Sequence, residues 1–419
     1  MSSPAADPTL AAPERLRRLT APAGVVLGLG QNGLATVRAL ARNGVPVVAI
    51  DSNLERPAAR TRLCEKIRCP EFARGGAGLV GTLMELGAAL PHGGVLFPSG
   101  DLNLRTISDH RDALARHYRF ALPDPATVRL ALDKRAFYEF AERAGFAIPR
   151  TWRLDAANLA AVARQVQYPV IVKPSLRDIG WRESERGGHK LYEVGSAEAL
   201  VAAFERLRAV SPELLVQESI PGPESELVFS LTYLDDDLEP LAMFTGRKLR
   251  QYRPRFGTSS MAVSAWMPEV AETSLAILRA MRYRGYASVE FKRDPRDGVL
   301  KVIEVTGRTW YPHGLATRCG VNLPYLAYRS LVGLPVERPA GFVEGVKWID
   351  EDRDPRAAVE SYRAGELALG EWIRSYRGRR TYALAAKDDP GPIVFLGLAM
   401  ARAAVRRLAR RARRQGAAA

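Results

Sequence analysis

Cysteine is scarce in this chain of 419 residues, which has only Cys64, Cys69 and Cys319. The first two are spaced C-x4-C with no second pair, so an ordinary zinc site is not expected. The three thiols are typical of a reduced cytosolic protein that needs no disulfides to stabilise its core. We therefore expect a cytoplasmic location.

Long apolar runs are also lacking. The apolar segment 392–401 has about half of the ~20 residues that a membrane-spanning helix needs. The stretch 21–30 follows three arginines but leads directly into a glycine-rich turn, so we interpret it as a β-strand and not as a signal peptide. The sequence therefore predicts no membrane span.

Lysine is much rarer than arginine. It occupies nine positions, whereas lysine and arginine together number 61 against 46 acidic residues, a formal net charge of +15. Seven arginines lie between residues 402 and 414 with no acid among them. A nucleic-acid-binding protein usually spreads basic residues over one face and interleaves aromatic ones, so nucleic acid is not an expected partner. The tail suits either a solvated helix or one that contacts an anionic membrane at its periphery.

The remaining chain alternates strands and helices and is long enough for several domains. We predict a flexible N-terminus at 1–19, a Rossmann-like α/β domain at 20–124, a domain at 125–335, an extension at 336–390 and a tail at 391–419. The domain at 125–335 divides into a smaller lobe at 150–220 and a larger, strand-rich lobe at 221–335. One helix is predicted over 126–144.

A glycine-rich turn opens the first helix. Gly28, Gly30 and Gly33 match G-x-G-x-x-G between a strand and a helix, and Asp51 ends the next strand. This pattern is typical of a dinucleotide site and supports an NAD(P)-dependent oxidoreductase as one hypothesis. The other interpretation is a tight strand-to-helix turn that binds no dinucleotide.

Two of the rare lysines stand at positions suited to phosphates. Lys173 ends the apolar strand 170–174, and a polar, glycine-containing loop at 176–189 follows it as a candidate lid. Lys134 lies on the preceding helix. Further along, the strand at 215–220 breaks at a Pro-Gly turn, which exposes backbone groups able to contact a purine.

Two glutamates are predicted to face each other. Glu290 and Glu304 lie in apolar strands joined by the turn 294–298, which makes the strands an antiparallel pair. A buried carboxylate is costly unless it is paired or bound to a cation. Opposed carboxylates are suitable ligands for Mg²⁺ that bridges nucleotide phosphates. Arg308 follows with a planar guanidinium suited to a phosphoryl oxygen.

Together these segments resemble the ATP-grasp superfamily, in its carboxylate–amine ligase branch, related to carbamoyl-phosphate synthetase, D-aspartate ligase and biotin carboxylase. The similarity covers roughly 20–335 and is carried by LDKRAFYEFAERAGFAIPRTW, YPVIVKPS, LVQESIPGPESEL, ASVEFKRD and VIEVTGRTWYPHGLATRCGVNLPYLAY. It implies a Rossmann-like pre-ATP-grasp domain followed by a two-lobed ATP-grasp fold. The N-terminal glycine turn then need not bind a dinucleotide.

The resemblance also implies roles for individual residues. Lys134 and Lys173 would contact the α- and β-phosphates. The adenine would be lined by Gln217, Glu218 and Ile220, and the ribose would be held by Glu226 or Glu224. Mg²⁺ or Mn²⁺ would be bound by Glu290 and Glu304, and Arg308 would contact the transferred phosphoryl group. Lys248, with Arg247, is a candidate to steer an anionic substrate or the triphosphate. Tyr311, His313 and Arg318 are candidates for the acceptor pocket.

Two segments depart from the family pattern. Glu304-Val-Thr306 stands where Glu-x-Asn is usual, so that Thr306 would be the third metal-binding residue. The lid has Trp181–Arg186 in place of a tight Gly-Ser cluster.

The sequence thus predicts an ATP- and Mg²⁺-dependent ligase that joins a small carboxylate to an amine through an acyl phosphate and releases ADP and phosphate. Homodimerisation is left open. The alternatives are the oxidoreductase above and a non-catalytic, nucleotide-binding regulator associated with a membrane.

Overall fold

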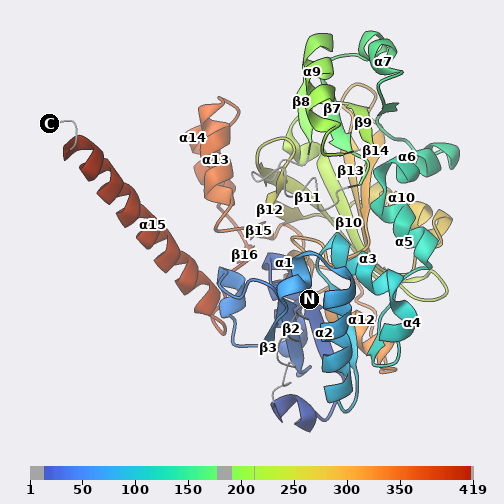
Figure 1. The fold of residues 1–419 in the computed structure, drawn as a ribbon, viewed down its shortest axis with the longest axis vertical. Coiled ribbons are helices and arrows are strands. Elements are labelled where there is room, and N and C mark those ends of the chain that lie inside the picture. Colours follow the sequence, from blue (N-terminus) through green and yellow to red (C-terminus); the bar gives the residue numbers. More distant parts are fainter. Residues whose placement is uncertain (1–13, 177–190, 212, 417–419) are drawn as a thin grey trace, which may run out of the picture.

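The computed structural model describes residues 14–176, 191–211 and 213–416, with side chains as far as residue 406. Three β-sheets organise this part of the chain (Figure 1). The predicted lid at 176–189 lies outside the described residues except for Leu176, which is exposed.

The N-terminal sheet has five parallel strands in the order β3-β2-β1-β4-β5. Its three central strands are buried throughout, as expected for a parallel sheet with helices on both faces. The strands are β1 (Ala23–Leu27), β2 (Val47–Asp51), β3 (Glu65–Arg68), β4 (Gly94–Pro98) and β5 (Tyr118–Arg119), and the helices are α1 (Gln31–Ala41), α2 (Gly76–Ala89), α3 (Asp101–Asp109) and α4 (Arg111–Leu114). Short 3₁₀ turns form η1 (Glu14–Arg18), η2 (Pro57–Arg60) and η3 (Pro70–Ala73).

The prediction of one helix over 126–144 is wrong. The segment forms α5 (Pro125–Leu132) and α6 (Lys134–Arg143), separated by Asp133 in an extended conformation. The Asp133 carboxylate accepts hydrogen bonds from the Ala136 amide (3.1 Å) and the Ser175 hydroxyl (2.6 Å). Asp133 therefore caps α6 at its N-terminus and places Lys134 on the first turn, next to the strand that ends at Pro174.

The second sheet is small and antiparallel, with the order β6-β9-β7-β8. Its strands are β6 (Thr151–Leu154), β7 (Val170–Pro174), β8 (Tyr192–Val194) and β9 (Leu214–Glu218), packed with α7 (Leu159–Gln165) and α9 (Ala197–Leu207). Ser196 caps the N-terminus of α9, because its hydroxyl accepts from the Ala199 amide (3.2 Å). The two strands are antiparallel, so the end of β7 lies beside the start of β9, with Lys173 opposite Leu215.

The third sheet is the largest, with the order β14-β13-β10-β11-β12-β15-β16. Its strands are β10 (Leu227–Leu234), β11 (Pro240–Tyr252), β12 (Thr258–Ser264), β13 (Gly285–Arg293), β14 (Leu300–Thr306), β15 (Lys347–Ile349) and β16 (Arg380–Tyr382). The 3₁₀ turn η4 (Glu224–Glu226) leads into β10, and the sheet packs with α10 (Pro268–Ala280), α11 (Gly314–Arg318) and α12 (Leu323–Leu331). Because β15 and β16 come from the predicted extension 336–390, that segment is part of this sheet.

The last helices are α13 (Asp354–Arg363), α14 (Leu369–Ser375) and α15 (Gly391–Gly416). Helix α15 starts against the N-terminal α/β unit and then extends away from the rest of the molecule (Figure 1). None of the helices in the described part of the chain combines the length and apolar character that a membrane span requires.

Candidate active site

A cavity of about 510 Å³ is lined by the small sheet, the large sheet and the N-terminal unit. Most of the residues predicted to act on a nucleotide line it: Lys134, Lys173, Gln217, Glu218, Ile220, Lys248, Glu290, Glu304, Thr306 and Arg308. They come from segments far apart in the sequence. Of the lining side chains, seven are cationic and four are carboxylates, so the cavity favours a polyanionic ligand.

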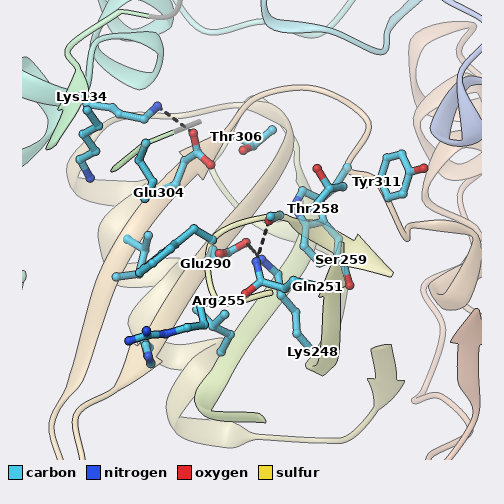
Figure 2. A pocket seen from close by; sticks show the side chains of 18 of the residues that line it. Lys134, Lys248, Gln251, Arg255, Thr258, Ser259, Glu290, Glu304, Thr306 and Tyr311 are labelled. Carbon is cyan, nitrogen blue, oxygen red and sulfur yellow. Dashed lines mark hydrogen bonds and ion pairs between the residues drawn. The ribbon is translucent and has the colours of Figure 1, made fainter. Parts of the chain in front are cut away.

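The two predicted glutamates face each other as expected. Glu290 on β13 pairs in register with Glu304 on β14, and both side chains line the cavity. Figure 2 shows the two carboxylates on one wall, each beside a lysine. Glu304 accepts from the Lys134 ammonium (Nζ–Oε1 2.9 Å), and Glu290 pairs with Lys248 (Nζ–Oε2 2.6 Å).

The Glu290–Lys248 pair is largely buried, with 15% and 5% of the side chains exposed. Lys248 points inward from β11, and its ammonium lies 5.8 Å from the centre of the Trp310 ring. Arg247, its neighbour in the sequence, does not line the cavity because successive residues of a strand point to opposite faces. Of the two basic residues, only Lys248 lies where it could contact a ligand there.

Lys173 has a strongly lowered pKa. It is 5% exposed and donates to the Tyr138 hydroxyl (2.9 Å) and to Oε1 of Gln217 (2.7 Å), neither of which carries a negative charge. Burial, reinforced by repulsion from Lys134 and only partly offset by Glu304, lowers the pKa of Lys173 to about 7. An anionic ligand would supply the missing counter-charge.

Gln217 and Glu218 end β9, and Ile220 follows two residues later. The Gln217 amide donates through Nε2 to the Thr151 hydroxyl (2.7 Å), which fixes the orientation in which Oε1 faces Lys173. The Glu218 carboxylate pairs with Arg296 (2.6 Å), and the Ile220 carbonyl accepts from Lys292 (2.7 Å). Lys292 also lines the cavity.

The two candidate ribose ligands lie elsewhere. The Glu224 carboxylate accepts from the backbone amides of Gln251 (2.8 Å) and Arg255, and it lines a neighbouring cavity of about 350 Å³. Burial raises the pKa of Glu224. Glu226 is half-buried and lines neither of these two cavities. The structure therefore does not bring either glutamate to the main cavity wall.

Arg308 is held at the junction with the N-terminal unit. Its Nε donates to Asp101 at the start of α3 (2.6 Å), and both residues line the cavity. Burial alone would raise the pKa of Asp101, but the ion pair with Arg308 outweighs it and lowers that pKa. Thr306 lines the same wall at the end of β14 and is 8% exposed.

Sequence reasoning missed two lining residues, Gln251 and Arg353, at the end of the cavity formed by β11, β12 and the extension. Gln251 is 3% exposed; its Nε2 donates to the Gly257 carbonyl (2.6 Å), while Oε1 has no hydrogen-bond partner among the described residues. Arg353 lies over the Tyr311 ring (4.7 Å), 4.0 Å from Asp350. The predicted candidate Tyr311 also lines this end. No local motif marks Gln251 or Arg353, because their position depends on long-range strand pairing.

The other acceptor-pocket candidates lie outside the cavity. His313 is fully buried between Asn32 and Thr36, with Nε2 2.9 Å from the Asn32 carbonyl oxygen. Burial lowers the pKa of His313 to about 4, so the ring is neutral at pH 7 and packs α11 against α1. Arg318 is exposed on α11.

The glycine turn at 28–33 has a structural role, because it allows close packing of α1. A Cβ at Gly33 would come within 1.8 Å of the Gly28 carbonyl oxygen, so α1 packs directly on the turn. Asp51 is 1% exposed and its carboxylate accepts from the amides of Leu29 (2.7 Å) and Asn53 (2.9 Å). In a dinucleotide site this carboxylate would have to accept from a ribose hydroxyl, so the geometry favours the structural interpretation.

The carboxylates fit Mg²⁺ only together with a bound molecule. The described residues contain no group of three or more His, Cys, Asp or Glu side chains that could hold a metal ion. Mg²⁺ is commonly bound by one or two carboxylates, with phosphates and water as the other ligands. Glu290 and Glu304, with the Thr306 hydroxyl nearby, satisfy that pattern if a phosphorylated ligand occupies the cavity.

Comparisons with known proteins agree with this geometry. No family model matches the chain. It is 24% identical to D-aspartate ligase of Enterococcus faecium over 237 residues, 55% of this chain and 56% of that protein. It is 30% identical to D-alanine–D-alanine ligase of a Marinomonas species over 194 residues, 43% of this chain and 56% of that protein. The chain thus spans just over half the length of these curated relatives.

Among solved structures, the chain resembles a complex of biotin carboxylase from Campylobacter jejuni with β-γ-ATP (TM-score 0.60, 15% identity, 78% of this chain and 74% of that one). The fold is therefore that of the ATP-grasp enzymes, a Rossmann-like domain followed by two lobes, as the sequence predicted. In sequence, the chain is similar to parts of D-aspartate ligase and D-alanine–D-alanine ligase.

Proposed function

We propose that the protein is an ATP- and Mg²⁺-dependent carboxylate–amine ligase. The observation that carries the proposal is the arrangement around Glu290 and Glu304: two opposed carboxylates, each beside a lysine, in a cavity whose charged side chains are mostly cationic. This combination suits a triphosphate with its metal ion. The ligase homologues support the same activity.

The proposed reaction has two steps. A carboxylate oxygen of the first substrate attacks the γ-phosphorus of ATP, the bond from that phosphorus to the bridging oxygen breaks, and ADP leaves with an acyl phosphate formed. The nitrogen of the second substrate then attacks the acyl carbon, phosphate leaves, and the nitrogen loses a proton as the amide forms. Mg²⁺, held by Glu290, Glu304 and the Thr306 hydroxyl, would neutralise phosphate charge.

The roles proposed for the chain's residues follow from their positions. Lys134 and Lys173 bind the α- and β-phosphates, while Gln217, Glu218 and Ile220 line the adenine; Arg308 and Lys248 stabilise the charge of the transferred phosphoryl group. For Glu224 to bind the ribose, its carboxylate would have to exchange two backbone amides for hydroxyls. Glu226 would need to turn toward the cavity.

The end of the cavity formed by Gln251 and Arg353 is proposed to hold the second substrate. Oε1 of Gln251 is an acceptor without a donor among the described residues, which suits an N–H of an amine. The Gly257 carbonyl fixes this amide orientation because only Nε2 can donate to it. Arg353 can donate to an anionic group, since its ion pair with Asp350 is long (4.0 Å).

The test is ADP and phosphate release with ATP, Mg²⁺ and a panel of small carboxylates and amines. Release should require one member of each class, and Glu290→Gln should lower the rate about 100-fold or more. Glu85→Gln, which changes an exposed glutamate on α2, is the matched control and should leave the rate unchanged. ATP binding without turnover for any pair would contradict the proposal and favour the non-catalytic regulator. Tight NADH binding without any ATP binding would favour the oxidoreductase.

A further inference from the structure

The first turns of α15 are fixed to the N-terminal unit. Just before the helix, Asp389 forms a buried ion pair with Arg38 on α1 (3.0 Å), whose guanidinium also donates to the Leu384 carbonyl (2.7 Å). Leu396 is 6% exposed, and the Phe395 ring lies against the Arg60 guanidinium (4.4 Å). The start of α15 therefore moves with the folded body.

Beyond Leu396 the helix exposes an apolar stripe. Leu398 and Val405 are 53% and 65% exposed, and Val394, one turn earlier, is 57% exposed. With Ala401, these residues follow the 4-3-4 spacing of one helix face, and in the sequence the spacing continues at Leu408 and Ala412. Figure 1 shows this part of α15 extending away from the other elements. The stripe has no covering element among the described residues.

The positive charge of α15 indicates which kind of partner could cover the apolar stripe. Arg402 and Arg406 are exposed on α15, the sequence adds five more arginines up to residue 414, and it has no Asp or Glu from 391 to the end. A second copy of the helix would bring two cationic segments together with no carboxylate to pair with them. An anionic surface is complementary to the arginines and accepts the apolar stripe as well.

We propose that α15 binds the surface of an anionic lipid bilayer, with its apolar stripe in the headgroup boundary and its arginines at the lipid phosphates. Because the base of α15 is clamped by Asp389 and Leu396, binding holds the catalytic body at the membrane in a limited range of orientations. This inference concerns location and does not depend on the reaction that the cavity catalyses.

The experiment is vesicle flotation of the full chain. The protein should float with vesicles of phosphatidylglycerol and phosphatidylcholine and remain unbound with phosphatidylcholine alone, and added salt should weaken binding. Arg402→Gln with Arg406→Gln should lower the affinity about 25-fold, since each arginine near an anionic surface contributes about fivefold. Leu398→Asn with Val405→Asn should lower it about tenfold or more.

Arg143→Gln with Arg164→Gln is the matched control: both side chains are exposed on α6 and α7, and the same charge is removed away from α15. This variant should bind vesicles as the parent protein does. Circular dichroism should show that all variants stay folded.

Several outcomes would overturn the proposal. They are absence of flotation, equal binding to neutral vesicles, and the same loss of binding in the control variant. Concentration-dependent dimerisation that Leu398→Asn with Val405→Asn abolishes, without vesicle binding, would assign the stripe to a second copy instead. Tighter binding to single-stranded RNA than to the anionic vesicles would assign the arginines to nucleic acid.

Discussion

Lys173 should take up a proton when ATP binds. In the free protein its pKa is about 7, because the ammonium is buried and repelled by Lys134. At pH 8 such an amine is only about one-tenth protonated. A triphosphate beside it favours the charged form and returns the pKa toward its ordinary value. Binding at pH 8 should therefore consume about 0.9 proton per ATP, and affinity should fall about tenfold per pH unit above about pH 7.

Isothermal titration calorimetry measures this uptake directly. ATP-Mg²⁺ is titrated at pH 8 in buffers that differ in ionisation enthalpy, and the dependence of the observed heat on that enthalpy gives the number of protons. Lys173→Met should bind more weakly and show almost no uptake. Lys134→Met should also show reduced uptake, because removing the neighbouring charge raises the pKa of Lys173. Tight binding by the parent protein without uptake, or equal uptake by Lys173→Met, would refute the reasoning.

Three further predictions concern the buried polar groups. Glu290→Gln should lower the free energy of unfolding by about 3–5 kcal/mol in urea denaturation, because a buried lysine loses its carboxylate; unchanged stability would contradict the pairing. Gln251→Leu should raise the KM of the amine about tenfold and leave the KM of ATP unchanged, and equal effects on both would place the residue elsewhere. Asp389→Ala should also lower the free energy of unfolding by about 3–5 kcal/mol, because Arg38 stays buried and unpaired. Asp388→Ala breaks an exposed pair and should lower it by less than about 1 kcal/mol. Similar losses of stability in the two variants would contradict this difference.

The features that local sequence determines were predictable. The turn at 294–298 joins β13 and β14, so the alternation of side chains along each strand placed Glu290 opposite Glu304. The apolar strand that ends at Lys173 likewise predicted a lysine at the cavity wall. These positions follow from spacing within one strand pair or at one strand end.

The features that depend on distant contacts were not predictable. Asp133 divides a helix because the hydroxyl of Ser175, just after β7, donates to its carboxylate. Gln251 lines the cavity because β11 pairs with β12, and the extension contributes Arg353 because β15 adds to the same sheet. No periodicity in the sequence records these pairings. The carboxylates that pair with the cavity lysines could not be predicted either, because these ion pairs also join distant segments.

Oxygen-18 transfer tests the proposed acyl phosphate most directly. The carboxylate substrate that gives the highest ADP release in the panel is labelled with oxygen-18 in its carboxyl group, and the phosphate released with ATP and the amine is analysed by mass spectrometry. If the carboxylate attacks the γ-phosphorus, each turnover leaves one labelled oxygen in the released phosphate. Unlabelled phosphate, with the label kept in the acid and the amide, would contradict the proposed reaction.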